Sequence, residues 1–129
     1  MVNNKEKFSN ELPILPIGAI SQALGVHQRT LRIYDKEGIL CPKITEKNRR
    51  LYSIDDLEKA KLIQFLTRNL ALNLSGVKII LSMLEMSEVS PKDYIDYIKK
   101  VANASKIDLE VQESNIEKTS KRGRKPNVK

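Results

Sequence analysis

The chain has 129 residues, with 23 Lys and Arg against 16 Asp and Glu, a net charge of +7 and an isoelectric point of about 9.5. This length suits one domain with an appendage, and a single Cys excludes a disulfide framework or a multi-Cys metal site. The apolar runs are too short to span a membrane, and the N-terminus has no apolar signal-peptide segment. We therefore expect a small, basic, soluble protein of a reducing compartment.

The positive charge is concentrated in two segments. Residues 27–52 hold seven basic and three acidic residues, whereas residues 53–117 hold eight basic and eleven acidic ones. Residues 118–129 hold six basic residues and no acidic residue. Two separate positive segments on a neutral-to-acidic body predict a polyanionic partner such as nucleic acid.

Two short helices are predicted after a polar arm at residues 1–12 and a short extended segment. Apolar residues recur at helical spacing from Ile17 to Leu24 and stop at Gly25, a frequent signal for the end of a helix. A second helical stretch follows and ends near Gly38. Two short helices separated by a turn that contains Gly are typical of a helix-turn-helix.

A small β-hairpin is predicted next. Pro42 prevents the second helix from continuing, and Asn48 lies between two short extended runs. Asn tolerates the left-handed backbone of a tight turn, so the segment is interpreted as a hairpin, or wing. Ser53 and Asp56 have the spacing of a capping box, which predicts that another helix begins there.

Three more helices complete the prediction. The helix after the capping box runs to about Ala71, and the following one opens at Leu74. A Ser/Pro break then precedes a last helix over residues 91–117, whose apolar face needs a partner. The residues predicted to form a dimer interface on this helix are Tyr94, Tyr97, Ile98, Val101 and Ala104. Residues 118–129 are expected to be a disordered basic tail.

Three motifs follow one another in order over the first part of the chain. They are the runs from Ile17 to Val26, from Thr30 to Pro42 and from Asn48 to Leu57. Together they resemble the DNA-binding domain of the MerR family of transcription regulators, with the resemblance extending from Pro16 to Leu84. It implies a mainly α, winged helix-turn-helix domain over residues 13–86, with a small β-hairpin wing and a C-terminal dimerisation helix.

A narrower resemblance concerns the run from Asn69 to Val77, which is similar to the start of the fourth helix in the HspR-type repressors of chaperone genes. The chain also departs from the family pattern. Asn48 and Arg49 stand where members often have Gly-Tyr before the wing arginine. Metal-sensing members carry cysteines around their dimerisation helix, whereas no cysteine follows Cys41 here, so metal sensing is not expected.

The second predicted helix carries the polar side chains that a helix in the major groove needs. Side chains of its first turn approach base edges, where Arg can bind guanine bidentately and Gln can read adenine. The resemblance implies that Arg29, Thr30 and Ile33 face the DNA and that Tyr34 donates to a phosphate. Arg32 is ambiguous, because it could pair with a carboxylate of the same helix instead.

In the predicted wing, Arg49 and Arg50 are adjacent and point to opposite faces of a strand, so they cannot contact DNA equally. The resemblance favours Arg50 for a phosphate or minor-groove contact.

In the tail, the run from Lys121 to Pro126 imperfectly resembles an AT-hook, whose Arg-Gly-Arg core fits a narrow minor groove. A solvated basic tail is an equally good interpretation. The residues expected to bind DNA are Gln28, Arg29, Thr30, Arg32, Ile33, Tyr34, Arg49, Arg50, Tyr52, Arg122 and Arg124.

These features predict a sequence-specific regulator that binds double-stranded DNA as a homodimer on an inverted-repeat operator. The HspR resemblance implies a repressor of heat-shock and chaperone genes in the bacterial cytoplasm, associated with the nucleoid, with the chaperone DnaK as candidate co-repressor. Two alternatives stay open: a MerR-type activator that responds to an unknown effector, and a nonspecific architectural protein driven by its basic tail.

The sequence contains no Gly-rich phosphate loop, nucleophile motif, paired catalytic carboxylates or cluster of metal ligands. We therefore expect no enzyme activity, no cofactor, no bound metal and no membrane partner. His27 is expected at the surface or at a helix cap, and Cys41 is expected to be a half-buried thiol.

Overall fold

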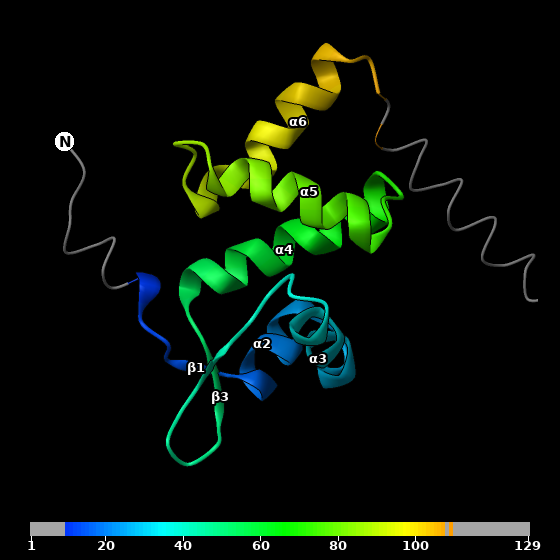
Figure 1. The fold of residues 1–129 in the computed structure, drawn as a ribbon. Helices are drawn as coiled ribbons and strands as arrows, with labels where there is room; N and C mark the ends of the chain where they lie inside the picture. The colour runs from blue at the N-terminus through cyan, green and yellow to red at the C-terminus, as the bar shows by residue number, and fades with distance from the viewer. Residues whose placement is uncertain (1–9, 108, 110–129) are drawn as a thin grey trace, which may run out of the picture.

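The computed structural model describes residues 10–107 and residue 109 of the chain. This part is mainly helical with one small antiparallel sheet (Figure 1). The elements in chain order are β1 (Leu15–Pro16), α2 (Ile17–Leu24), α3 (Gln28–Lys36), β2 (Lys43–Ile44), β3 (Arg50–Tyr52), α4 (Ile54–Asn69), α5 (Leu74–Glu85), the 3₁₀ turn η1 (Pro91–Asp93) and α6 (Tyr94–Ala104). Within the described residues, no helix combines the length and the apolar character needed to cross a membrane.

The helices α2 and α3 form the predicted helix-turn-helix, and Gly25 makes the turn between them. Gly25 has a φ of 69°, a left-handed conformation that glycine adopts without steric cost. The backbone N–H of Gly25 donates to the carbonyl of Gln22 at 3.3 Å, and that of Val26 donates to the carbonyl of Ser21 at 3.1 Å. These two bonds close α2 and turn the chain toward the start of α3.

The sheet has the strand order β1-β3-β2, and both pairings are antiparallel. The strands β2 and β3 form the predicted hairpin, in whose turn Asn48 has a φ of 66°. The sequence predicts only an extended segment where β1 lies, because two residues that include a proline carry no strand pattern. Its strand character comes from pairing far along the chain, with Leu15 opposite Tyr52 and Pro16 opposite Leu51.

The helix α4 begins at the predicted capping box. The hydroxyl of Ser53 accepts from the backbone N–H of Asp56 at 3.0 Å, and the carboxylate of Asp56 accepts from the backbone N–H of Ser53 at 2.9 Å. Asp55 and Asp56 also place negative charge at the positive end of the helix. The cap of α5 is not anticipated from the sequence: there, the side chain of Asn73 accepts from the backbone N–H of Gly76 at 2.8 Å.

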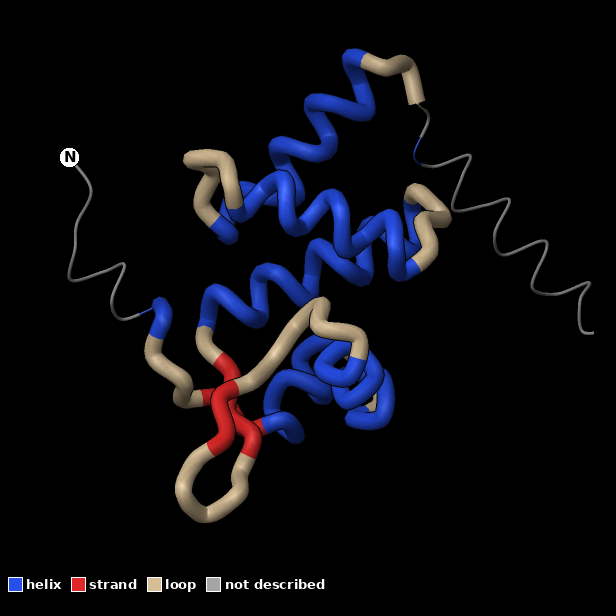
Figure 2. The backbone as a smooth tube through the Cα atoms, viewed as in Figure 1, coloured by secondary structure: helices blue, strands red, loops and turns tan. Residues whose placement is uncertain are grey.

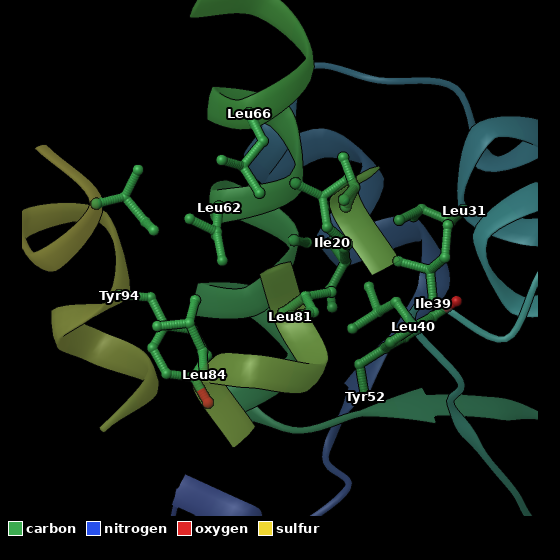
Figure 3. Packing of buried hydrophobic residues seen from close by; sticks show 14 residues of the cluster. Ile20, Leu31, Ile39, Leu40, Tyr52, Leu62, Leu66, Leu81, Leu84 and Tyr94 are labelled. Atoms are coloured by element: carbon green, nitrogen blue, oxygen red, sulfur yellow. The ribbon is translucent and has the colours of Figure 1, made fainter. Parts of the chain in front are cut away.

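The core lies around α4, which runs between the helix-turn-helix with its sheet and the pair α5 and α6 (Figure 1). The largest fully buried side chains are Tyr52, Ile20, Leu31, Leu62, Ile63, Leu66 and Val77. Figure 3 shows side chains from α2, α3, β3, α5 and α6 meeting those of α4 in one cluster. Because this core is continuous, packing on α4 holds both α3 and the base of the wing.

The C-terminal helix differs from its prediction. The apolar pattern predicts one helix over residues 91–117, whereas the structure has η1 followed by α6, which ends at Ala104. Lys106 then adopts a φ of 59°, outside the helical region. Apolar spacing alone does not sustain a helix, because most helical stability comes from packing against a partner. The parts of the predicted arm, last helix and tail that lie outside the described residues are 1–9, 108, 110–117 and 118–129.

Candidate nucleic-acid interface

The first turn of α3, where a helix-turn-helix presents its base-reading side chains, is open to solvent. His27 precedes the helix with an extended backbone, and its side chain makes no capping hydrogen bond. His27 and Arg29 are exposed, and Gln28 and Thr30 are half-buried. The turn contains no acidic residue, so its side-chain charge adds to the positive end of the helix dipole.

A broad, open depression of about 1070 Å³ borders this turn. It is lined by the end of α2, the turn and the start of α3, namely Ser21, Gln22, Gly25, Val26, His27, Gln28, Arg29, Thr30 and Arg32. The lining includes two arginines and a histidine but no carboxylate. The charged side chains of this concave surface are therefore all positive, which favours the approach of a polyanion.

The side chain of Gln28 is held in place by contacts with Arg32 and Gly18. The Nη2 of Arg32 donates to the Oε1 of Gln28 at 3.3 Å, one turn away on the same helix. The Nε2 of Gln28 lies over Gly18 of α2, where an added Cβ would be 3.5 Å from it. Arg32 thus contacts Gln28 and not the carboxylate that the sequence leaves as an alternative. Arg29 and Thr30 are the candidates on this turn that remain for direct base contacts.

Farther along α3, side chains divide between the core and the surface. Leu31 is completely buried, whereas Ile33 is 43% exposed, as expected for a residue that faces DNA. Tyr34 is half-buried, and burial raises the pKa of its hydroxyl, an effect that the nearby guanidinium of Arg68 opposes. The phenol stays protonated at neutral pH and can donate to a phosphate oxygen. Arg68, near the end of α4, is missed by the prediction because α3 and α4 meet only in the folded chain.

The loop of the wing projects away from the helices (Figure 2). In this loop the backbone N–H of Thr45 donates to the carbonyl of Arg49 at 2.9 Å, and the hydroxyl of Thr45 accepts from the N–H of Arg49 at 3.1 Å. The side chain of Arg49 is exposed, whereas Arg50 is half-buried and its Nε lies 3.6 Å from the Oδ2 of Asp35 in α3. The two adjacent arginines therefore lie in different environments, and Asp35 is a partner that the sequence does not identify.

Tyr52 is a core residue, and the prediction that it contacts DNA is wrong. It has no exposed surface, and burial together with the nearby carboxylate of Asp35 raises the pKa of its hydroxyl to about 12. Tyr52 shares one face of β3 with Arg50, since alternate residues of a strand point the same way. That face turns toward the helices. The base of the wing is therefore part of the core, whereas the loop of the wing projects into solvent.

The predicted dimer face on α6 is partly wrong as well. Tyr94 and Ile98 are only 2% and 7% exposed, because they pack into the core of their own chain. Tyr97 and Val101 are 45% and 46% exposed, and Ala104 is also exposed. These three residues follow one another at helical spacing, so they form a strip that the other residues described in the structure leave open. Of the five predicted residues, these three remain available to a second chain.

The predictions for Cys41 and for the basic tail have different outcomes. Cys41 is exposed and not half-buried, and its thiol lies 3.8 Å from the backbone carbonyl of Asp35. Desolvation and the neighbouring Asp35 raise the pKa of this thiol, which disfavours the reactive thiolate. The tail residues Arg122 and Arg124 lie outside the described residues.

Comparison with known proteins gives one family match and several relatives. The profile of the family described as "MerR HTH family regulatory protein" matches residues 15–84, which hold α3 and the wing. The chain is 32% identical over 80 residues to a candidate heat shock protein named HspR from Streptomyces coelicolor, an overlap of 62% of this chain and 53% of HspR. It is 34% identical over 73 residues to the HTH-type transcriptional regulator GlnR of Bacillus anthracis, an overlap of 57% of this chain and 56% of GlnR.

The chain thus spans about half the length of these curated relatives. Among solved structures, it is similar to the HTH-type transcriptional regulator SkgA from Caulobacter crescentus, with a TM-score of 0.55 and 19% identity. The similarity covers 92% of this chain and 84% of that chain. At this level of identity the likeness concerns the fold alone.

Proposed function

The chain belongs to the MerR HTH family of regulatory proteins, and we propose that it is a sequence-specific transcription regulator that binds double-stranded DNA. The observation that carries the proposal is the exposed first turn of α3 together with the wing loop that projects from the helices. Arg29 and Thr30 on that turn have the hydrogen-bonding groups that read base edges, and Arg49 on the wing suits a phosphate. A helix of this kind fits the major groove of B-DNA.

The form that we propose is a homodimer on an inverted-repeat operator. The support is the apolar strip of Tyr97, Val101 and Ala104 on α6, which a second copy of the strip would cover. Two-fold symmetry would present two α3 helices to major grooves one helical turn apart, about 34–36 Å. Each α3 then reads one half-site, and the half-sites are inverted with respect to each other.

The genes that we propose as targets are heat-shock and chaperone genes, which the chain would repress. The support is the sequence similarity to HspR and the resemblance of the run from Asn69 to Val77. On this hypothesis the chaperone DnaK is the candidate co-repressor. The identity to GlnR, whose name specifies only a transcriptional regulator, is at a similar level. A MerR-type activator with an unknown effector is therefore kept as the alternative.

Genome-wide occupancy of the chain before and after heat shock distinguishes these targets. We expect occupancy at chaperone promoters to fall on heating while the corresponding transcripts rise. Unchanged occupancy at chaperone promoters, or a fall in transcripts on deletion of the gene for this protein, would contradict the repressor hypothesis. The second result would instead favour the activator.

Duplex binding by the full chain tests sequence-specific recognition directly. Selection from a random-sequence duplex pool should recover an inverted repeat, and recovery of no motif would contradict the proposal. Arg29→Ala should weaken binding to the recovered duplex by about 5- to 150-fold, since loss of a base contact costs about 1–3 kcal/mol. Lys92→Ala is the matched control, because it removes one positive charge from the exposed surface of η1, away from α3, the wing and the strip on α6, and should change binding by less than about twofold.

The architectural alternative assigns DNA binding to the basic tail, including Arg122 and Arg124. On that alternative, deleting residues 118–129 abolishes binding and Arg29→Ala has no effect. We expect instead that the deletion weakens binding to operator and random duplex by the same factor, because tail charges act through counterion release. The ratio of the two affinities should then stay unchanged.

A further inference from the structure

One ion pair joins α3 to the wing. The Nε of Arg50 in β3 lies 3.6 Å from the Oδ2 of Asp35 in the last turn of α3. The other ion pairs found within residues 10–107 lie between α4 and α5 and inside α4. The Asp35–Arg50 pair therefore links the two elements that are proposed to contact DNA.

The ion pair covers the Nε of Arg50 while part of the side chain stays exposed. The side chains of Asp35 and Arg50 are 28% and 39% exposed. The Nε of Arg50 is buried and has no hydrogen-bond partner among the described residues. The exposed surface of Arg50 must then lie elsewhere on the side chain, whose other N–H donors are the two Nη groups. Because a guanidinium is planar, an ion pair on the Nε edge restricts the direction in which the Nη groups point.

The backbone on both sides of the pair is tied to the core and to the end of α3. Tyr52 lies on the same face of β3 as Arg50 and is completely buried, so it anchors the strand in the core. At the end of α3, the carbonyl of Asp35 accepts from Gly38 at 3.0 Å and the carbonyl of Tyr34 accepts from Ile39 at 2.8 Å. Asp35 also lies close enough to Tyr52 to raise the pKa of its hydroxyl. The Asp35 carboxylate is therefore held at the junction of α3, β3 and the core.

We propose that Asp35 is a positioning residue for DNA binding, which acts by holding Arg50 in the orientation that meets the DNA backbone beside α3. The inference rests on the proposed function and specifies how the wing is aligned with the helix that reads the bases. Asp35 itself touches no DNA. Its carboxylate takes the Nε edge of the guanidinium, and the Nη groups are left to bind phosphate oxygens.

A carboxylate near DNA has an electrostatic cost, and this cost makes the proposal testable. Negative charge at the interface weakens binding to any duplex, whatever its sequence. Neutralising a carboxylate with no further role should therefore strengthen binding to operator and random DNA alike. Neutralising a positioning carboxylate should weaken operator binding, because a directed phosphate contact by Arg50 fixes the register of α3 on the operator. On random DNA no single register is selected, so binding there should stay equal or become tighter. The two roles therefore predict opposite changes in affinity for the operator when the carboxylate is neutralised.

The experiment compares Asp35→Asn with Glu37→Gln in the full chain. Each substitution removes one negative charge at the end of α3 with almost no change in side-chain size, and Glu37 is exposed at the C-cap. Affinities are measured for the duplex that the unmodified chain selects and for a random duplex of equal length. We expect Asp35→Asn to weaken operator binding by about tenfold, the order of one charge-assisted hydrogen bond to a phosphate, and Glu37→Gln to strengthen both affinities slightly. If Asp35→Asn behaves like Glu37→Gln on both duplexes, the proposal is wrong.

A second variant keeps the test independent of any effect of Asp35→Asn on folding, which thermal unfolding will measure. Lysine keeps the charge of Arg50 but lacks its Nε edge, so Arg50→Lys should lower the operator-to-random ratio by a similar factor. Adding Asp35→Asn to Arg50→Lys should then change the ratio by less than about twofold, because the two residues act as a unit. An unchanged ratio for Arg50→Lys, or additive effects in the double variant, would overturn the proposal.

The outcome also distinguishes this inference from the proposed function. If the unmodified chain selects no motif, the proposed function fails and the role of Asp35 falls with it. If a motif is recovered but Asp35→Asn binds it as well as the unmodified chain does, the proposed function stands and only the positioning role is wrong.

Discussion

Replacing Tyr52 with Phe removes one oxygen atom from a side chain without exposed surface, and this change separates a core role from a DNA contact. The hydroxyl has no hydrogen-bond partner among the described residues. A buried hydroxyl without a partner costs about 1–3 kcal/mol of stability. Its removal leaves a void of about 15 Å³, which at about 24 cal/mol per Å³ costs about 0.4 kcal/mol. Tyr52→Phe should therefore raise the free energy of unfolding by about 1 kcal/mol.

The increase in the free energy of unfolding caused by Tyr52→Phe should become larger at high pH. The pKa of the Tyr52 hydroxyl rises from its ordinary value of 10.0 to about 12 in the folded chain, mainly because of burial. The folded state thus holds this proton more tightly than the unfolded state does, so the associated stability is complete below pH 10. It is lost as the pH rises from 10 through about 12. The advantage of Tyr52→Phe over the unmodified chain should therefore grow across this window.

Urea unfolding followed by circular dichroism, at pH 7 and again between pH 10 and 12, measures both effects. Operator binding at pH 7 should stay within about twofold of the unmodified chain, because the hydroxyl does not reach the surface. A loss of about 1 kcal/mol or more in the free energy of unfolding would show that the hydroxyl is paired in the folded state. Strongly weakened operator binding at unchanged stability would show that the Tyr52 hydroxyl contacts DNA and would contradict its assignment to the core.

Two further substitutions concern the cap of α4 and the exposed strip of α6. Ser53→Ala removes the hydroxyl that accepts from Asp56 and should lower the free energy of unfolding by about 1 kcal/mol in a urea titration; unchanged stability would mean that the cap contributes nothing. Val101→Glu places a charge on the exposed strip and should give a folded monomer by sedimentation, whereas Ile98→Glu should unfold the chain because Ile98 is 7% exposed. A Val101→Glu chain that stays dimeric at low concentration would contradict the proposed dimer face.

The features that sequence reasoning predicts correctly are formed by residues close together in the chain. The backbone N–H groups of Gly25 and Val26 close α2 by donating to carbonyls three and five positions earlier, and the capping box joins Ser53 and Asp56. Asn48 makes the hairpin turn with a left-handed backbone. Each of these depends on local geometry and on the conformational freedom of one residue type, so the pattern is visible without knowledge of the fold.

The candidate site shows where this reasoning stops. The exposure of Arg29 and Ile33 on α3 follows from helical periodicity once Leu31 is placed in the core. The burial of Tyr52 does not, because a strand of three residues has two faces and only its packing decides which is covered. The ion pair from Asp35 to the wing has no sequence signal, since its two residues belong to elements separated by a loop and a turn.

By itself the sequence determined the family, the helix-turn-helix with its wing, and the concentration of positive charge around α3. Only the tertiary structure decided which side of α6 faces outward, that β1 joins the sheet, and that Asp35 meets Arg50. The physical reason is the range of the interactions. Caps and turns are made by neighbours in the chain, whereas burial and ion pairs between elements depend on how α4 brings distant segments into one core.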